Sequence, residues 1–334
     1  MNLTLRLVAA GMLLLATVGA DASEPASYTQ GGQRFVADMV REHGFDAAEL
    51  TKLVDQARYR QPIIDAMTRP YESKPWFRYR KIFLTSDRID KGVAYWRAHR
   101  VLLAQAAAAY GVAPEIIVAI IGIETNYGGN LGEHRVIDAL STLGFSYPKR
   151  AAFFRKELEE FLLLTQEEQM DPLAAMGSYA GAMGKPQFIP SSYRAYSVDF
   201  DKDGRRDLWG SDADVIGSVA SYFKRHGWRR SEPVVYAARL ASGSVLTIEA
   251  AEKKPVAPNI TVSRLVDAGV TVDHSLPPDT LGTLIRLDNP DDEYWFGLQN
   301  FYAITRYNHS NLYAMAAFQL SQEIKRAFRG KGDS

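Results

Sequence analysis

A long apolar run that ends in a single acidic residue places the strongest constraint on how this chain folds. Residues 116–123 are all apolar apart from one glycine, and Glu124 follows them directly. Pro114 suits the first turn of a helix, and Gly128 suits a left-handed helix stop. The sequence therefore predicts a buried core helix that carries one carboxyl group in its last turn.

The predicted position of Glu124 suits acid chemistry. Burial and the negative end of a helix both raise the pKa of a carboxyl group, so that it can hold a proton at neutral pH. A glycosidase uses such a carboxylic acid to protonate a leaving oxygen. A solvated glutamate at a helix end is the alternative, and this motif alone does not decide between the two.

The first 22 residues have the features of a signal peptide. Arg6 provides a positive charge, residues 8–20 form a short apolar core, and the small-x-small sequence at 20–22 predicts cleavage before Ser23. A membrane-spanning helix is the alternative, but the apolar stretch is short for one. Cysteine is absent, which excludes disulfides, thiolate metal sites and a lipid-modified cysteine. We therefore expect a mature protein that is soluble in the periplasm, with no transmembrane segment.

The overall charge argues against a nucleic-acid partner. The chain has 39 Lys and Arg residues and 39 Asp and Glu residues, so its formal net charge is zero. A neutral protein has no global field to attract nucleic acid or an anionic membrane. Any attraction for an acidic substrate must therefore be local.

The order of sequence patterns predicts a mainly α fold (α+β). We expect two short helices within 33–60, an irregular aromatic and basic stretch at 62–81, and a long helix at 86–110. Further helices are expected near 134–143, 150–165, 212–225 and 309–328. Short strands are expected at 234–236, 245–248, 260–262, 284–287 and 293–298.

A second informative motif lies at residues 177–193, which read GSYAGAMGKPQFIPSSY. Glycine, proline and hydroxyl-bearing residues in this density suit a rigid loop that presents backbone and hydroxyl groups to a polar ligand. A purely structural glycine-rich connector is the alternative.

Together, Ile-Glu-Thr-Asn-Tyr-Gly at 123–128 and the motif at 177–193 resemble the membrane-bound lytic murein transglycosylase B family, here as a soluble form without a lipidation cysteine. The similarity extends from about residue 30 to 328. It implies a lysozyme-like α core at 104–231, completed by 293–313. It also implies an N-terminal helical domain at 23–103, completed by a C-terminal helix at 314–334, and a small inserted β domain at 232–292.

The resemblance also implies an activity on peptidoglycan glycan strands. Such enzymes cleave the β-1,4 bond between N-acetylmuramic acid and N-acetylglucosamine and leave a 1,6-anhydromuramoyl end. Glu124 would be the single acid and then the base. A muramidase that hydrolyses the same bond and a non-catalytic peptidoglycan-binding scaffold are the rivals, and binding to cell-wall synthesis proteins stays open.

The family's substrate-binding residues match eight further positions of this chain, for which ordinary packing or a solvated surface is the alternative. Ser178 matches a hydroxyl near the catalytic carboxyl or the acetamido group, Gln187 a subsite amide, and Asn308 an asparagine near the catalytic glutamate. The sugar-stacking or groove-lining rings would be Tyr307, Tyr313 and Tyr79, and the basic pair facing peptide or lactyl carboxylates would be Lys149 and Arg150. Lysine stands at 149 where the family has arginine, which puts bidentate carboxylate binding there in doubt.

An acidic loop predicts a calcium site. Asp199, Asp201 and Asp203 precede Gly204 in the D-x-D-x-D-G opening of a calcium loop. Position 12 of the loop is a glycine rather than the bidentate glutamate of an EF-hand. The similar family closes its EF-hand-like loop, here 199–214, with an aspartate of the next helix. Asp214 matches it best and Asp212 next, and the carbonyl of Arg205 would be a further ligand. We expect a structural Ca²⁺, with a metal-free acidic turn as the alternative.

Overall fold

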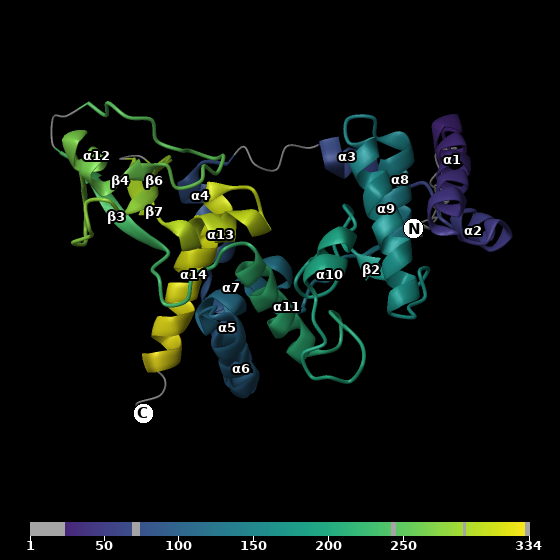
Figure 1. Cartoon of the computed structure of the whole chain (residues 1–334), viewed down its shortest axis with the longest axis horizontal. Coiled ribbons are helices and arrows are strands. Elements are labelled where there is room, and N and C mark those ends of the chain that lie inside the picture. The colour runs from purple at the N-terminus through teal and green to yellow at the C-terminus, as the bar shows by residue number, and fades with distance from the viewer. Residues whose placement is uncertain (1–23, 69–73, 242–244, 290–291, 331–334) are drawn as a thin grey trace, which may run out of the picture.

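Helices form most of the molecule, and a small sheet lies at one end of it (Figure 1). The computed structural model describes residues 24–68, 74–241, 245–289 and 292–330. The predicted signal peptide at 1–22 lies outside these residues. The mainly α fold with a small β insertion is confirmed.

One group of helices lies at the end of the molecule opposite the sheet (Figure 1). Asp46 caps the second of these helices by accepting a hydrogen bond from the backbone N–H of Glu49 at 2.8 Å. Helices α1 and α3 pack on α8, α2 packs on α1, and α8 packs on α9. The group comprises α1 (Ala26–His43), α2 (Ala47–Val54), α3 (Gln61–Thr68), α8 (Val136–Ser146) and α9 (Ala151–Glu167).

A second group of helices forms the centre of the molecule. The C-terminal helix α14 (Asn311–Gly330) packs on α4 (Trp76–Phe83), α5 (Ser86–Ala98) and α7 (Pro114–Thr125). The remaining members are α6 (Arg100–Tyr110), α11 (Asp212–Arg225) and α13 (Gln299–Tyr307), while α10 (Pro190–Tyr196) packs on both α9 and α11 and joins the two groups. Residues 23–103, expected as one domain, therefore contribute to two packing groups, because α1 and α3 pack on α8 whereas α4 and α5 pack on α14.

Two local predictions in this region were wrong. The described parts of the stretch at 62–81, expected to be irregular, are mostly helical, because residues 62–68 belong to α3 and residues 76–81 to α4. Trp76 lies at the start of α4 with its side chain fully buried, so burial of its aromatic surface favours an ordered segment. The long helix expected at 86–110 is two helices, which are separated at His99.

Helix α7 occupies the core, as its apolar run predicts. Every residue from Glu115 to Ile123 is buried. Burial on all sides explains why this helix has no polar face. In the described part of the chain no single helix is long and apolar enough to cross a membrane, although α6 and α7, which are bent by 113°, would pass together by length and composition.

The sheet has five antiparallel strands in the order β4-β6-β7-β3-β5. It has its own small apolar core, which includes Leu265, Leu284 and Phe296. The strand predicted at 245–248 is not present, while β5 and the helix α12 were not predicted. The elements are β3 (Val235–Leu240), β4 (Ile260–Thr261), α12 (Val262–Asp267), β5 (Val270–Val272), β6 (Leu281–Leu287) and β7 (Glu293–Gly297).

A separate two-stranded ladder joins the glycine-rich loop to the start of α8. Strand β1 (His134–Arg135) pairs antiparallel with β2 (Met176–Gly177), and His134 lies opposite Gly177. Gly132 approaches the backbone of Gly177 so closely that a Cβ there would lie 2.1 Å from the Gly177 carbonyl oxygen. The ladder therefore fixes where the loop at 177–193 begins.

Candidate active site

Glu124 is half-buried in the last turn of α7, and its surroundings favour the protonated form. Burial raises the pKa of its carboxyl group from 4.5 to about 7. The hydroxyl of Tyr313 donates a hydrogen bond to Glu124 Oε1 at 2.5 Å and lowers the pKa, so it offsets part of the burial effect. The other oxygen, Oε2, has no hydrogen-bond partner among the described residues and is available to a ligand.

The backbone directly after this helix follows an unusual left-handed path. Asn126, Tyr127 and Gly128 have φ angles of 50°, 61° and 87°. A tyrosine rarely adopts this conformation, so its surroundings must hold it there. The Tyr127 hydroxyl donates a hydrogen bond to the backbone oxygen of Arg88 on α5 at 3.0 Å.

Two glycines make room for Tyr127. A Cβ at Gly122 would lie 2.4 Å from the Tyr127 hydroxyl oxygen, and one at Gly92 would lie 2.5 Å from it. Arg88 supports the same junction, because its Nε donates to the carbonyl of Gly122 at 3.0 Å. These contacts fix the turn that ends the helix of Glu124. Sequence reasoning missed Tyr127 and Arg88, since only the glycine within the apolar run at 122 hints at a close approach.

The glycine-rich loop is tied to the same helix end. The Thr125 hydroxyl donates to the carbonyl of Lys185 at 2.9 Å, and the Tyr307 hydroxyl donates to the carbonyl of Pro186 at 2.6 Å. Gln187 lies in the left-handed region with a φ of 51°. The two sequence motifs thus meet in space, and Tyr307 of α13 and Tyr313 of α14 lie beside the carboxyl group of Glu124.

Ser178 and Gln187 make hydrogen bonds within this loop. Ser178 Oγ accepts from the backbone N–H groups of Ala180 and Ala182, at 3.2 and 3.0 Å. Gln187 Nε2 donates to the carbonyl of Gly184 at 3.0 Å. Both side chains are half-buried. They shape the loop, and neither forms a hydrogen bond with Glu124.

Of the three predicted tyrosines, Tyr307 and Tyr313 lie near Glu124, and Tyr313 and Tyr79 are too buried for the expected stacking on a sugar. Tyr313 is 3% exposed, so its ring has no open face for a sugar, and its hydroxyl binds the carboxyl group instead. Tyr79 is also buried, and it packs on Trp76 and Phe83. Tyr307 is half-buried, and its ring lies parallel to that of Tyr313 with 6.5 Å between the ring centroids. Of the three, Tyr307 is the most open to a ligand.

The other predicted binding residues lie further out. Asn308 is exposed directly after α13, next to Tyr307. Lys149 and Arg150 are exposed before α9, and the Arg150 guanidinium lies 4.3 Å from the ring centroid of Phe153. None of these three side chains forms a hydrogen bond or ion pair with Glu124 among the described residues. The geometry thus brings Tyr307 and the helix end tied to the loop to the carboxyl group, and leaves the basic pair in the turn before α9.

The acidic loop has the donors of a calcium site. Asp199, Asp201 and Asp203 place carboxylate oxygens within 4.8 Å of one another. Oxygens that surround one Ca²⁺ at 2.3–2.6 Å lie at about such separations, and carboxylates are the ligands that this hard cation prefers. Gly204 provides the sharp turn with a φ of 93°. The residues therefore fit a calcium ion.

The two aspartates considered for closing the loop face different neighbours. Asp214 is fully buried and accepts hydrogen bonds from the backbone N–H groups of Phe200 and Asp207, at 2.7 and 2.8 Å. Burial raises its pKa, and the charges of Asp201 and Asp199 raise it further. Asp212 instead binds Lys185 Nζ at 2.7 Å. Asp214 thus lies beside the acidic cluster, whereas Asp212 contacts the glycine-rich loop.

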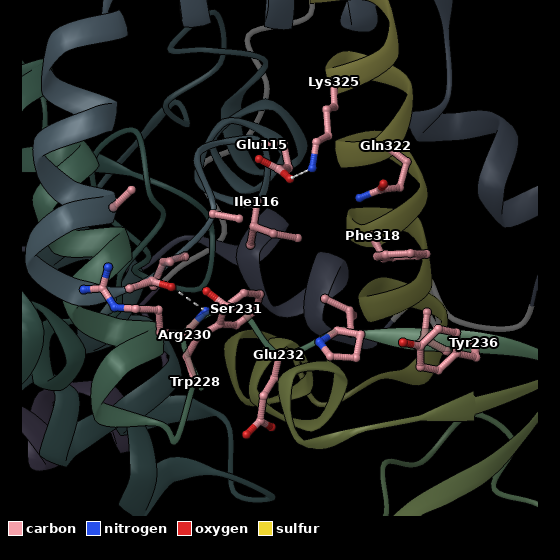
Figure 2. Close-up of a pocket in the computed structure, with 17 residues that line it drawn as sticks. Glu115, Ile116, Trp228, Arg230, Ser231, Glu232, Tyr236, Phe318, Gln322 and Lys325 are labelled. Carbon is pink, nitrogen blue, oxygen red and sulfur yellow. Dashed lines mark hydrogen bonds and ion pairs between the residues drawn. The ribbon is translucent and has the colours of Figure 1, made fainter. Parts of the chain in front are cut away.

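A cavity of about 620 Å³ lies at the opposite end of α7 from Glu124 (Figure 2). Glu115 in the first turn of α7 forms an ion pair with Lys325 there, at 2.5 Å. Glu115 and Glu124 are nine positions apart along the helix, which corresponds to a rise of about 14 Å. None of the residues predicted for the active site lines this cavity, so the cavity does not belong to the same site.

Comparisons with known proteins agree with the motifs. Residues 27–322 match the family model described as Transglycosylase SLT domain. The chain is 45% identical to membrane-bound lytic murein transglycosylase B of Escherichia coli over 308 residues, which cover 87% of this chain and 82% of that protein.

Solved structures give the same result. The soluble lytic transglycosylase SltB1 of Pseudomonas aeruginosa is 50% identical with a TM-score of 0.84, and the match covers 90% of this chain and 99% of that one. Slt35 of Escherichia coli, solved in complex with calcium, is 43% identical with a TM-score of 0.82, covering 90% and 94%. SltB3 of Pseudomonas aeruginosa, solved in complex with NAG-NAM-pentapeptide, is 30% identical with a TM-score of 0.78, covering 90% and 80%. The lysozyme-like core predicted from the motifs is confirmed by this similarity, and the chain belongs to the transglycosylase SLT domain family of lytic transglycosylases.

Proposed function

We propose that this protein is a peptidoglycan lytic transglycosylase in which Glu124 serves as both acid and base. The observation that carries the proposal is a lone carboxyl group with a pKa near 7 at the junction of the two family motifs. Such a pKa leaves much of the acid protonated at neutral pH and still allows it to act as a base. The substrate is the glycan strand, in keeping with the ligand of SltB3.

The geometry suits a two-step reaction at one carboxyl group. Tyr313 occupies Oε1, so the proton on Oε2 passes to the glycosidic oxygen as the C1–O bond breaks. The acetamido group of the substrate stabilises the positive charge at C1. The carboxylate of Glu124 then takes the proton of the C6 hydroxyl, and O6 forms the new bond to C1. The products are a free 4-hydroxyl group and a 1,6-anhydro ring, and no water is consumed.

The surroundings of Glu124 favour this scheme over hydrolysis by two carboxyl groups. A retaining or an inverting glycosidase normally places a second carboxylate about 5–10 Å from the acid. Among the described residues no other carboxyl group perturbs the pKa of Glu124, which depends on burial and on Tyr313. The charge at C1 is therefore left to the substrate's own acetamido group.

The supporting residues fall into two sets in this proposal. Tyr313 orients the carboxyl group, and the exposed or half-buried side chains bind the glycan. Ser178 and Gln187 hold the loop beside the reacting sugar, Tyr307 and Asn308 border it, and Lys149 and Arg150 bind carboxylates further along the strand. Tyr79 lies close enough to Tyr313 to help raise the pKa of its hydroxyl group.

Two further parts of the proposal concern the ion and the location. Ca²⁺ would be held by Asp199, Asp201 and Asp203, with the Arg205 carbonyl and Asp214 completing the loop. The ion would supply structural stability only, because no step of the reaction needs it. After removal of residues 1–22, the protein would act in the periplasm, where its substrate lies. Binding to cell-wall synthesis proteins stays an open prediction.

The test compares the wild type with Glu124→Gln on purified sacculi. The wild type should release muropeptides that end in anhydro sugars, which are lighter by one water than hydrolysed products and separable by mass spectrometry. Glu124→Gln should bind sacculi and release nothing. Hydrolysed products from the wild type would identify a muramidase, and equal release by the variant would identify a different catalytic group.

A further inference from the structure

A polar cavity lies beside the ladder that leads into the glycine-rich loop. Its volume is about 570 Å³, and it is lined by Arg58, Arg60, Pro62, Glu133, His134, Arg135 and Asp138. His134 and Arg135 form β1, whose partner β2 ends at Gly177, directly before Ser178. The cavity is therefore coupled to the predicted glycan-binding loop through a single backbone ladder.

The walls of the cavity are fixed by Asp138 at the start of α8. Arg135 donates to Asp138 through Nε at 3.0 Å and through Nη2 at 2.6 Å. The backbone N–H of Arg58 donates to the same carboxylate at 2.9 Å, and Arg60 Nε lies 3.5 Å from it. The backbone N–H of Arg60 binds the Thr142 hydroxyl at 3.1 Å. The buried carboxylate of Asp138 thus has its negative charge balanced by Arg135 and Arg60. It anchors the segment that carries Arg58 and Arg60.

Arg58 provides a charge that the fold does not use. Its side chain is exposed and forms no hydrogen bond or ion pair with the described residues. The hydrogen bond from Arg58 to Asp138 comes from the backbone N–H and leaves the guanidinium group free. Three arginines line the cavity against two acids, Glu133 and Asp138, which leaves an excess of one positive charge. A guanidinium group binds a carboxylate through two parallel hydrogen bonds, which makes arginine the preferred residue for such a ligand.

We propose that this cavity binds a carboxylate of the peptide stem of peptidoglycan, with Arg58 as its main contact. The inference rests on the proposed function, because it names a second part of the same substrate. A glycan strand on the loop would carry its peptide away from the sugar backbone, and SltB3 accepts a glycan with a pentapeptide attached. The excess positive charge and the free guanidinium select the acidic part of that peptide. Arg58 would therefore set a preference for substrates with charged stems.

The experiment uses two substrates with the same glycan. One is a tetrasaccharide that bears pentapeptide stems, and the other is the same molecule with its carboxyl groups converted to primary amides. Values of kcat/KM are measured by release of anhydro product for the wild type, Arg58→Ala, Arg58→Lys and the control Arg239→Ala. Arg239 is an exposed arginine of β3 outside the cavity and the active site.

Arg58→Ala should lower kcat/KM about fivefold on the acidic substrate, as expected for a partly exposed charged hydrogen bond, and less than twofold on the amidated one. The loss should appear in KM rather than kcat. Arg58→Lys should recover part of it, and Arg239→Ala should match the wild type. An equal loss on both substrates, or no loss on either, would overturn the inference. Absence of anhydro product from the wild type on both substrates would instead overturn the proposed function.

Discussion

The ionisation of Glu124 should make the stability of the whole protein depend on pH. Its pKa in the folded protein is about 7, against an ordinary value of 4.5. The folded state therefore holds this proton more tightly than the unfolded chain does. The associated stabilisation is fully present below pH 4.5 and is lost as the pH rises through 7. A change of this size in the pKa corresponds to about 3 kcal/mol.

Glu124→Gln removes the ionisation and keeps an oxygen that can accept the hydrogen bond from Tyr313. The variant and the wild type should have similar free energies of unfolding at pH 4. The variant should then become the more stable by about 3 kcal/mol at pH 8.5, because the wild type has to bury a charge there and the variant does not.

The measurement is urea unfolding followed by tryptophan fluorescence at intervals from pH 4 to pH 8.5, with calcium held constant. Glu49→Gln is the matched control, since Glu49 is an exposed glutamate on α2, and its curve should stay parallel to that of the wild type. A difference between Glu124→Gln and the wild type that stays constant to within about 1 kcal/mol over the whole range would refute the reasoning. Glu124 would then be charged in the folded protein at neutral pH, and it could not act as the acid.

Three other changes test neighbouring parts of the site. Tyr313→Phe removes the hydrogen bond that lowers the pKa of Glu124, so the fall of kcat/KM at high pH should move upward by about one pH unit; an unmoved limb in the pH profile would contradict this. A chelator should lower the melting temperature of the wild type and leave that of Asp201→Asn unchanged. Bound Ca²⁺ should stabilise the folded wild type by about 3 kcal/mol when its concentration is a hundredfold above its Kd. Equal shifts of the melting temperature for both proteins would argue against a calcium site in the acidic loop. Gly122→Ala places a Cβ 2.4 Å from the Tyr127 hydroxyl oxygen, so it should destabilise the protein by about 1–3 kcal/mol and lower kcat. Adding Tyr127→Leu to this variant should restore much of the stability, because it removes the hydroxyl group that the Cβ approaches. No recovery in the double variant would show that the two side chains do not compete for space.

The local elements followed from the sequence where the pattern was long and clear. Helix α7 begins at Pro114, as its place in the sequence predicts, and the backbone turns left-handed directly after Thr125. The helix is buried because its long run of apolar residues offers no polar face to water. Helix α11 has the predicted bounds of 212–225. The weaker patterns failed. The aromatic stretch before residue 81 turned out to be largely helical, since the burial of Trp76 outweighs its irregular composition.

The candidate site was predictable in part. Glu124 and the acidic loop were visible because a lone carboxyl group after an apolar run, and three aspartates at alternate positions, each carry their chemistry in a short segment. The role of Tyr313 was not visible. It lies 189 residues from Glu124, and nothing in its own neighbourhood along the chain distinguishes a buried hydroxyl that binds the acid from a ring that stacks on a sugar.

The sequence by itself determined which residues could do chemistry: one acid at the end of an apolar helix, a glycine-rich loop, and an acidic turn. Only the tertiary structure decided how that acid is tuned. The pKa of Glu124 depends on how far water is excluded and on the hydroxyl group supplied by α14. Both are set by helices that meet only after the chain has folded, because desolvation and hydrogen bonding act over a few ångströms in space and not along the chain.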